Sequence, residues 1–174
     1  MNIEVTPAGL HEKTALRNLM ELYVYEFSDM EGLDVDDSGL FGYRYLDLYW
    51  TESGRHPFLI RVEDKLAGFA LVRQGPSLTD KSTSSEGACT HMAEFFILRK
   101  YRRHGVGARA ARELFDRFPG HWEVSEIPEN TPAIAFWRKV IGEYSGGDYE
   151  EVFLDNERWK GPVQVFESAT RSRA

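Results

Sequence analysis

A basic loop with two glycines lies between an apolar run and an amphipathic segment, and this order restricts the fold more than any other feature of the chain. Residues 93–98 (AEFFIL) are rich in Phe and Ile, which favours a buried strand. The loop follows at residues 102–107 (RRHGVG). From Val106 to Phe118 apolar residues recur every four positions, which predicts an amphipathic helix, and residues 119–120 (PG) end it. The sequence therefore predicts a strand, a basic turn and a helix in direct succession.

The turn has the composition of a phosphate site. Glycines at a helix start let the backbone approach a ligand closely, and the first amide groups of a helix have no acceptor within it. These N–H groups carry partial positive charge, and the neighbouring arginines add full charges suited to phosphate oxygens. We therefore expect the start of this helix to bind a phosphate group.

The turn resembles the acetyl-CoA motif of the GNAT acetyltransferase superfamily. That motif is Gln or Arg, two residues, Gly, one residue, then Gly or Ala, at a strand-to-helix junction, and here it begins at Arg102. A second match starts at Asn130, with Ala133 three residues on and the aromatic pair Phe136 and Trp137 beginning six residues on. The pair of matches at the right separation makes the resemblance more specific than either alone.

The resemblance implies acetyl-CoA as co-substrate and a set of residues that hold it. Backbone amides of the loop would cradle the diphosphate, the strand before it would bond the pantetheine arm, and Asn130 would contact that arm. The implied cofactor-binding residues are Phe95, Phe96, Ile97, Arg102, Arg103, His104, Gly105, Val106, Gly107, Ala108, Asn130, Phe136 and Trp137.

An amine acceptor is almost fully protonated at neutral pH, so acetyl transfer to it needs a base or a water relay. Glu94 is the first candidate, because it lies at the family's glutamate position and would share a strand face with Phe96 and Leu98. Glu123 in the next strand is the second candidate. His91 is the third, and it faces away from Glu94 if the strand is regular.

The step that protonates the leaving thiolate departs from the family pattern. Trp137 stands where similar proteins often have a tyrosine, and an indole N–H is not a practical acid. Three alternatives stay open: Tyr144 reaches the site, Tyr149 reaches it, or the thiolate leaves unassisted, since a thiol pKa is about 8.5.

The rest of the chain predicts an order of strand, helices, three strands, helix, strand, helix and two strands. The expected segments are a strand at 1–5, a helix at 10–27 that starts from Thr6-Pro7, a loop at 28–39, a short helix at 40–50, a hairpin of 58–62 and 66–73, a loop at 75–87, strands at 89–98 and 122–125, a helix from Asn130 or Thr131 to about residue 145, a strand pair at 149–154 and 163–166, and a frayed tail at 168–174. This order matches the GNAT fold: an α/β (α+β) class, with a single domain over residues 1–174 and a mixed, mainly antiparallel sheet flanked by helices on both faces.

The composition limits the cellular compartment and the binding partners that we expect. Hydrophobic residues make up 42% of the chain, enough for a core, and no run approaches the ~18 apolar residues of a membrane span. The net charge of -7 argues against nucleic-acid binding and is compatible with a cationic acceptor. We find one cysteine, Cys89, no pattern typical of a signal peptide and no Cys/His spacing typical of metal sites. These features favour a cytoplasmic protein without a metal.

The predicted function is therefore transfer of an acetyl group from acetyl-CoA to a primary amine, of a small molecule or a peptide, within a ternary complex. The acceptor would approach between residues 40–50 and Glu94, and the resemblance is compatible with a homodimer.

Two alternatives stay open. One is a dinucleotide-binding enzyme, because Gly105, Gly107 and Ala110 fit a G-x-G-x-x-A fingerprint with Glu126 about 20 residues on. The other is a non-catalytic acyl-CoA-binding module of the same fold, which the tryptophan at position 137 favours.

Overall fold

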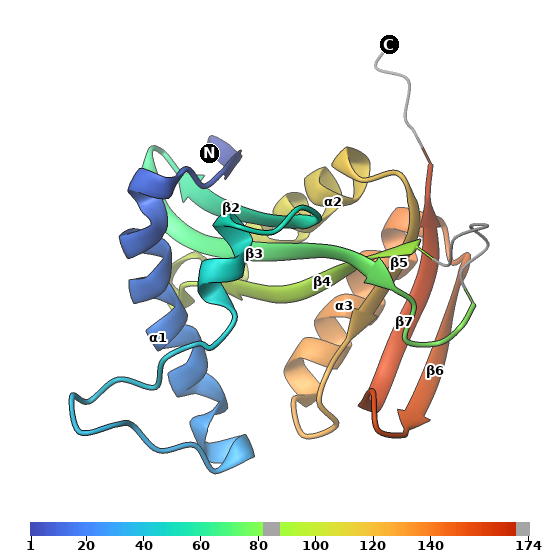
Figure 1. Cartoon of the computed structure of the whole chain (residues 1–174). Coiled ribbons are helices and arrows are strands. Elements are labelled where there is room, and N and C mark those ends of the chain that lie inside the picture. The colour runs from blue at the N-terminus through green and yellow to red at the C-terminus, as the bar shows by residue number, and fades with distance from the viewer. Residues whose placement is uncertain (82–87, 170–174) are drawn as a thin grey trace.

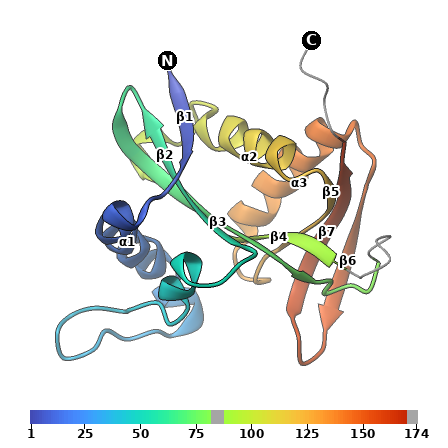
Figure 2. The same cartoon turned by 45° about the horizontal axis from the view of Figure 1, so that its top comes forward.

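Seven strands of the described residues form one mixed sheet in the order β1-β2-β3-β4-β5-β7-β6 (Figure 1 and Figure 2). The computed structural model describes residues 1–81 and 88–169. All neighbouring strands are antiparallel except β4 and β5, which are parallel. The strands are β1 (Ile3–Pro7), β2 (Arg55–Val62), β3 (Lys65–Pro76), β4 (Ala88–Ile97), β5 (Gly120–Ser125), β6 (Tyr149–Asp155) and β7 (Lys160–Ser168).

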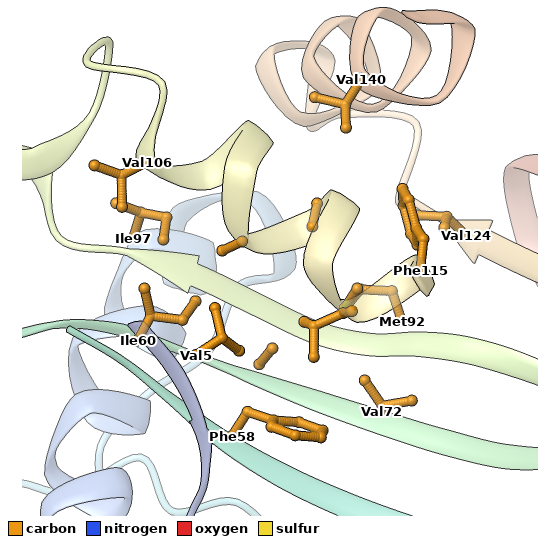
Figure 3. Packing of buried hydrophobic residues seen from close by; sticks show 14 of the residues in the cluster. Val5, Phe58, Ile60, Val72, Met92, Ile97, Val106, Phe115, Val124 and Val140 are labelled. Atoms are coloured by element: carbon orange, nitrogen blue, oxygen red, sulfur yellow. The ribbon is translucent and has the colours of Figure 1, made fainter. Parts of the chain in front are cut away.

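Helices cover both faces of this sheet, as the sequence predicts (Figure 2). Helix α1 (Lys13–Glu31) buries Leu16, Leu19 and Met20 on one face. Helices α2 (Val106–Arg117) and α3 (Thr131–Ser145) lie on the opposite face. Figure 3 shows side chains of α2 and α3 meeting the apolar side of β2, β3 and β4. The core therefore has two parts, one on each side of the sheet.

Several local predictions are confirmed. The hairpin between β2 and β3 turns through Glu63 and Asp64, whose φ angles of 47° and 63° suit a two-residue turn that follows the strand twist. The side chain of Asn130 accepts a hydrogen bond from the amide of Ala133 and so caps α3. The C-terminal strand pair also forms as predicted, as β6 and β7.

Three segment predictions are wrong at their boundaries. Thr6 and Pro7 do not start a helix but end β1, because an edge strand tolerates a residue without an N–H. Helix α1 continues past Ser28 to Glu31, and Gly32 ends it with a φ of 64°. In the predicted helix at 40–50, only Leu46–Trp50 forms a short 3₁₀ helix, because Glu21 accepts hydrogen bonds from the amides of residues 41 and 42 and holds them outside a helix.

The predicted loop at 75–87 begins later than expected, since β3 extends to Pro76. Residues 82–87 of that loop and residues 170–174 of the predicted frayed tail lie outside the described residues.

The predicted regular alternation of β4 is also wrong, because the strand contains a bulge. Leu71 pairs with Glu94 but the next residue of β3, Val72, pairs with Met92, so Ala93 is an extra residue in β4. Met92 consequently lies in the α2–α3 side of the core, whereas Phe96 lies in the α1 side. His91 therefore faces the same side of the sheet as Glu94, not the opposite one.

Candidate active site

A cleft opens where β4 and β5 stop pairing. The two strands pair only at Thr90 with Trp122 and at His91 with Glu123. Beyond these pairs lies a cleft of about 820 Å³, lined by the second half of β4, the C-terminal half of α1, the start of α2, the end of β5 and the start of α3. The bulge at Ala93 lies at its inner edge, where it helps the strands to diverge.

The basic loop places the N-terminus of α2 at one end of this cleft. Gly105 is the N-cap residue with a φ of 78°, a conformation that suits glycine, and the amide of Arg109 donates the first bond of the helix to its carbonyl. The preceding amides, of residues 106–108, therefore have no acceptor within the helix. The sequence predicts an anion site at these amides, and Gly105, Gly107 and Ala108 line the cleft.

Gly107 lies at a close contact between two helices. A Cβ atom at this position would lie 3.2 Å from the ring of Phe136 in α3 and 3.5 Å from the side chain of Ile97. The absence of a side chain lets α2 start close to both elements. The glycine motif therefore shapes the wall of the cleft as well as exposing amides.

Arg102 lines the cleft, and its guanidinium also contacts two neighbouring elements. Its Nη2 donates to both carboxylate oxygens of Glu26, at 2.9 and 2.8 Å, and its Nε donates to the carbonyl of Ile97 at 2.6 Å. The guanidinium thus ties the loop to α1 and β4. Arg103 and His104 are exposed beside the helix start, and Arg103 has a φ of 65°.

Glu94 lies in the cleft and is held by two tyrosines. Tyr23 of α1 donates its hydroxyl to Oε2 at 2.5 Å, and Tyr43 donates to Oε1 at 2.8 Å. Burial raises the pKa of Glu94 above its usual value, although the two tyrosine hydrogen bonds oppose the rise. A carboxylate with a raised pKa at the wall of a cleft is suited to accept a proton.

Glu123 is placed differently, since it is not among the described residues that line the cleft. It is buried, and its carboxylate accepts hydrogen bonds from the hydroxyls of Ser77 and Thr79 and from the amide of Leu78. Burial by itself would raise the pKa of Glu123, but these hydrogen bonds lower it below its usual value. His91 lies beside it at 3.9 Å and is also outside the cleft lining.

The predicted cofactor residues of α3 and β4 form an aromatic wall. Phe95 stacks on Phe136 with ring centroids 6.0 Å apart and contacts Trp137 edge-on at 5.1 Å. Asn130 also lines the cleft while its Oδ1 caps α3. Tyr144 donates to Asp116 at 2.7 Å, and neither it nor Tyr149 is among the described residues that line the cleft.

Sequence reasoning missed two parts of the site. The C-terminal half of α1 supplies Tyr23, Phe27 and Met30 to the cleft, although the sequence predicts a loop from residue 28 on. Glu126, which follows β5, also lines the cleft and is only 5% exposed. Burial raises the pKa of Glu126 to about 8.

The fold and cleft together define a class of protein. A helix N-terminus that presents free amides, a splayed parallel strand pair and a carboxylate with a raised pKa are suited to bind an anionic ligand beside a proton acceptor. The fingerprint of a dinucleotide-binding enzyme does not fit, because the described sheet has a single parallel strand pair rather than a doubly wound parallel order.

Comparison with known proteins identifies the family. The sequence profile described as "Acetyltransferase (GNAT) family" matches residues 17–142. The chain belongs to this family of acetyltransferases, it is an acyltransferase, and acetyl-CoA is its acyl donor. No curated protein matches the chain in sequence.

Solved structures share the fold at low sequence identity. An acetyltransferase from Thermus thermophilus has a TM-score of 0.65 at 16% identity, with 96% of this chain and 97% of that chain covered. A GNAT-family acetyltransferase from Streptococcus agalactiae has a TM-score of 0.66 at 12% identity, with 98% and 96% covered. Arabidopsis thaliana Naa50, in complex with the bisubstrate analogue CoA-Ac-MVNAL, has a TM-score of 0.58 at 14% identity, with 96% and 99% covered.

None of the helices in the described part of the chain has the length and apolar character needed to cross a membrane.

Proposed function

We propose that residues 1–174 act as one domain that transfers an acetyl group from acetyl-CoA to a primary amine, by direct attack in a ternary complex in the cytoplasm. The observation that carries the proposal is the position of Glu94 in the same cleft as the N-terminus of α2. The diphosphate would bind the amides of residues 106–108, and the pantetheine arm would follow β4 towards Glu94. The bisubstrate analogue bound to Naa50, CoA-Ac-MVNAL, supports an amine acceptor by analogy of fold alone.

The reaction would run through the following bond changes. Glu94 takes a proton from the ammonium group, and the amine nitrogen attacks the thioester carbonyl carbon. The carbon–sulfur bond then breaks to release CoA thiolate, and the nitrogen loses its second proton to solvent as the amide forms. A backbone amide of β4 would stabilise the developing oxyanion. The α1 side of the cleft, with Tyr23, Phe27 and Met30, would contact the carbon skeleton of the acceptor.

Glu126 would supply the proton that the thiolate takes up. Trp137 cannot donate it, and Tyr144 is bonded to Asp116 away from the cleft. Glu126 lines the cleft, and with a pKa of about 8 it is mostly protonated at neutral pH. Its acidity is close to that of a thiol, whose pKa is about 8.5, so proton transfer between them is nearly balanced.

Replacement of Glu126 with Gln should therefore slow turnover and stabilise the protein. We expect kcat to fall about 10-fold to 100-fold, towards the low end for loss of a general acid because thiolate leaves readily. The wild-type rate should decline above about pH 8 as Glu126 loses its proton, and this decline should disappear in the variant. The measurement is a pH profile of thiol release.

A stability measurement separates this role from a structural one. The pKa of Glu126 is raised in the folded state, so ionisation of this group lowers the free energy of unfolding. The full stability is therefore present at low pH and is lost as pH rises from about 4.5 to about 8. Glu126→Gln should thus melt at a higher temperature than the wild type at pH 9, with little difference at pH 4. A variant that is both slower and less stable at pH 9 would contradict the proposed role.

The proposed function itself is tested by an acceptor screen. Purified protein is incubated with acetyl-CoA and single amines (polyamines, amino-acid esters, lysine peptides and peptides with free N-termini), and free thiol is followed over time. We expect at least one amine to release CoA thiol and to gain an acetyl group by mass spectrometry. Thermal protection by acetyl-CoA without thiol release from any amine would instead support a non-catalytic acyl-CoA-binding module.

A further inference from the structure

Four side chains of metal-ligating types meet on one face of the sheet, just before the cleft opens. Cys89 and His91 lie two residues apart on β4, and His121 and Glu123 lie two residues apart on β5, so each pair points to one face. The register of the parallel strands sets His91 beside Glu123 and therefore Cys89 beside His121. All four are buried, with exposed fractions of 3%, 4%, 8% and 1% in chain order.

The distances among three members of this group, Cys89, His91 and Glu123, suit one small cation. One ligand atom from each of Cys89, His91 and Glu123 lies within 4.8 Å of the others. The Nε2 atom of His121 lies 3.7 Å from Glu123 Oε1, and the Nδ1 atom of His91 lies 3.9 Å from Glu123 Oε2. Zinc bonds of about 2.0–2.3 Å in tetrahedral geometry separate neighbouring ligand atoms by roughly 3.3–3.8 Å. The two measured separations therefore need only small adjustments.

In each histidine, one ring nitrogen is hydrogen-bonded to an acceptor outside the group, and the other nitrogen points towards Glu123. His91 Nε2 lies 2.9 Å from the carbonyl oxygen of Pro76, which can only accept, so this nitrogen carries the proton. His121 Nδ1 lies 2.8 Å from a carboxylate oxygen of Glu167 and carries its proton for the same reason. The other nitrogen of each neutral ring then offers a lone pair to the centre of the group. Metal-ligating histidines usually have this arrangement, with the second nitrogen held by a carbonyl or carboxylate.

Two further observations indicate that a positive charge belongs between these groups. His121 Nε2 is buried and has no hydrogen-bond partner among the described residues. Glu123 accepts hydrogen bonds from Ser77, Leu78 and Thr79, an arrangement typical of a carboxylate. A buried carboxylate that faces two nitrogen lone pairs is unfavourable unless a metal ion or a proton lies among them.

We propose that Cys89, His91, His121 and Glu123 bind one divalent transition-metal ion, with Zn²⁺ as the best match to two imidazoles, a thiolate and a carboxylate. Metal binding would displace the thiol proton of Cys89, which now donates to the carbonyl of Thr90 at 3.5 Å. His121 lies outside the closely spaced set of three and would turn towards the ion to become the fourth ligand. With four protein ligands and no open position for substrate, the ion would be structural. It would fasten β4 to β5 directly beside the point where they separate. Sequence spacing does not reveal the group, because its two halves lie on strands far apart in the chain.

Cobalt substitution tests this proposal independently of acetyl-CoA. Untagged protein is dialysed against chelator, and Co²⁺ is then added in steps. Because Cys89 is the chain's one cysteine, a thiolate-to-cobalt charge-transfer band in the near ultraviolet reports this site directly. We expect the band to saturate at one Co²⁺ per chain, together with visible bands of tetrahedral cobalt, and we expect one equivalent of Zn²⁺ to abolish them and to raise the melting temperature.

Variants assign the ligands. Cys89→Ser should lose the charge-transfer band, and His121→Gln should weaken Co²⁺ binding at least about 10-fold. His11→Gln, which changes a histidine far from the group, should behave as the wild type. If the wild-type protein shows no thiolate band and no thermal response to Zn²⁺, the proposal is wrong. Saturable binding that survives both ligand substitutions would place the metal elsewhere and would also overturn it. Neither outcome depends on acetyl transfer, so the proposed function would stand or fall separately.

Discussion

Replacing Gly105 with Asp is expected to remove acetyl-CoA binding while leaving the protein folded. Gly105 is the N-cap of α2 with a φ of 78°, and Asp is one of the few residues that adopt this conformation with little strain. Aspartate is also favourable at a helix N-cap. Its carboxylate would nevertheless face the diphosphate, and a pair of unit charges about 4 Å apart near a protein surface interacts by about 4 kcal/mol. We expect acetyl-CoA affinity to fall by at least about 100-fold in calorimetric titrations.

Gly105→Asn is the matched control, because asparagine has the same shape and backbone tolerance without the charge. The Asn variant should bind acetyl-CoA within about tenfold of the wild type, and both variants should melt at similar temperatures. Equal affinity for acetyl-CoA in the Asp and Asn variants would show that the diphosphate does not bind at this helix start.

Replacing Glu94 with Gln is expected to lower turnover by about 100-fold or more, because a general base typically contributes 10²–10⁴-fold. The amide still accepts a hydrogen bond from a tyrosine hydroxyl but cannot take a proton from the ammonium group. The affinity for acetyl-CoA should change little, since the proposed diphosphate site is formed by the amides of residues 106–108 and not by Glu94. The measurement is the initial rate of thiol release with saturating acetyl-CoA and the best amine of the screen.

The pH profile of Tyr43→Phe adds a second, independent readout for Glu94. The hydrogen bond from Tyr43 lowers the pKa of Glu94, so its removal should raise that pKa. A base acts only when deprotonated, and the rate is therefore lost as pH falls through the pKa of Glu94. In Tyr43→Phe this loss should occur at higher pH than in the wild type. Glu157→Gln, an exposed substitution, should leave both rate and profile unchanged, and an unchanged rate in Glu94→Gln would exclude Glu94 as the base.

The parts of the fold that follow from short-range rules could be predicted from the sequence. Asn130 caps α3 and two polar residues turn the β2–β3 hairpin because these conformations depend on neighbouring residues alone. The bulge at Ala93 could not be predicted, because it depends on the register between β3 and β4. The end of α1 is also hard to predict, since polar residues near Ser28 resemble a loop although Gly32 is the residue that ends the helix.

The candidate site likewise has parts that the sequence predicts and parts that depend on long-range contacts. The motif predicts the anion site at α2 and places Glu94 on the strand beside it. The tyrosines that hold Glu94 come from positions 71 and 51 residues away, and nothing in their local sequence marks them. Glu126 becomes notable only through its burial in the cleft, and the charge of Arg102 is directed to Glu26 by the packing of α1. Long-range contacts of this kind require the folded structure.

A crystal structure with acetyl-CoA tests the central claim most directly. The account predicts diphosphate oxygens about 2.9 Å from the amide nitrogens of Val106, Gly107 and Ala108, with the thioester carbonyl in the cleft next to Glu94. Density for acetyl-CoA that leaves these amides in contact with solvent, or that directs the thioester away from Glu94, would contradict it.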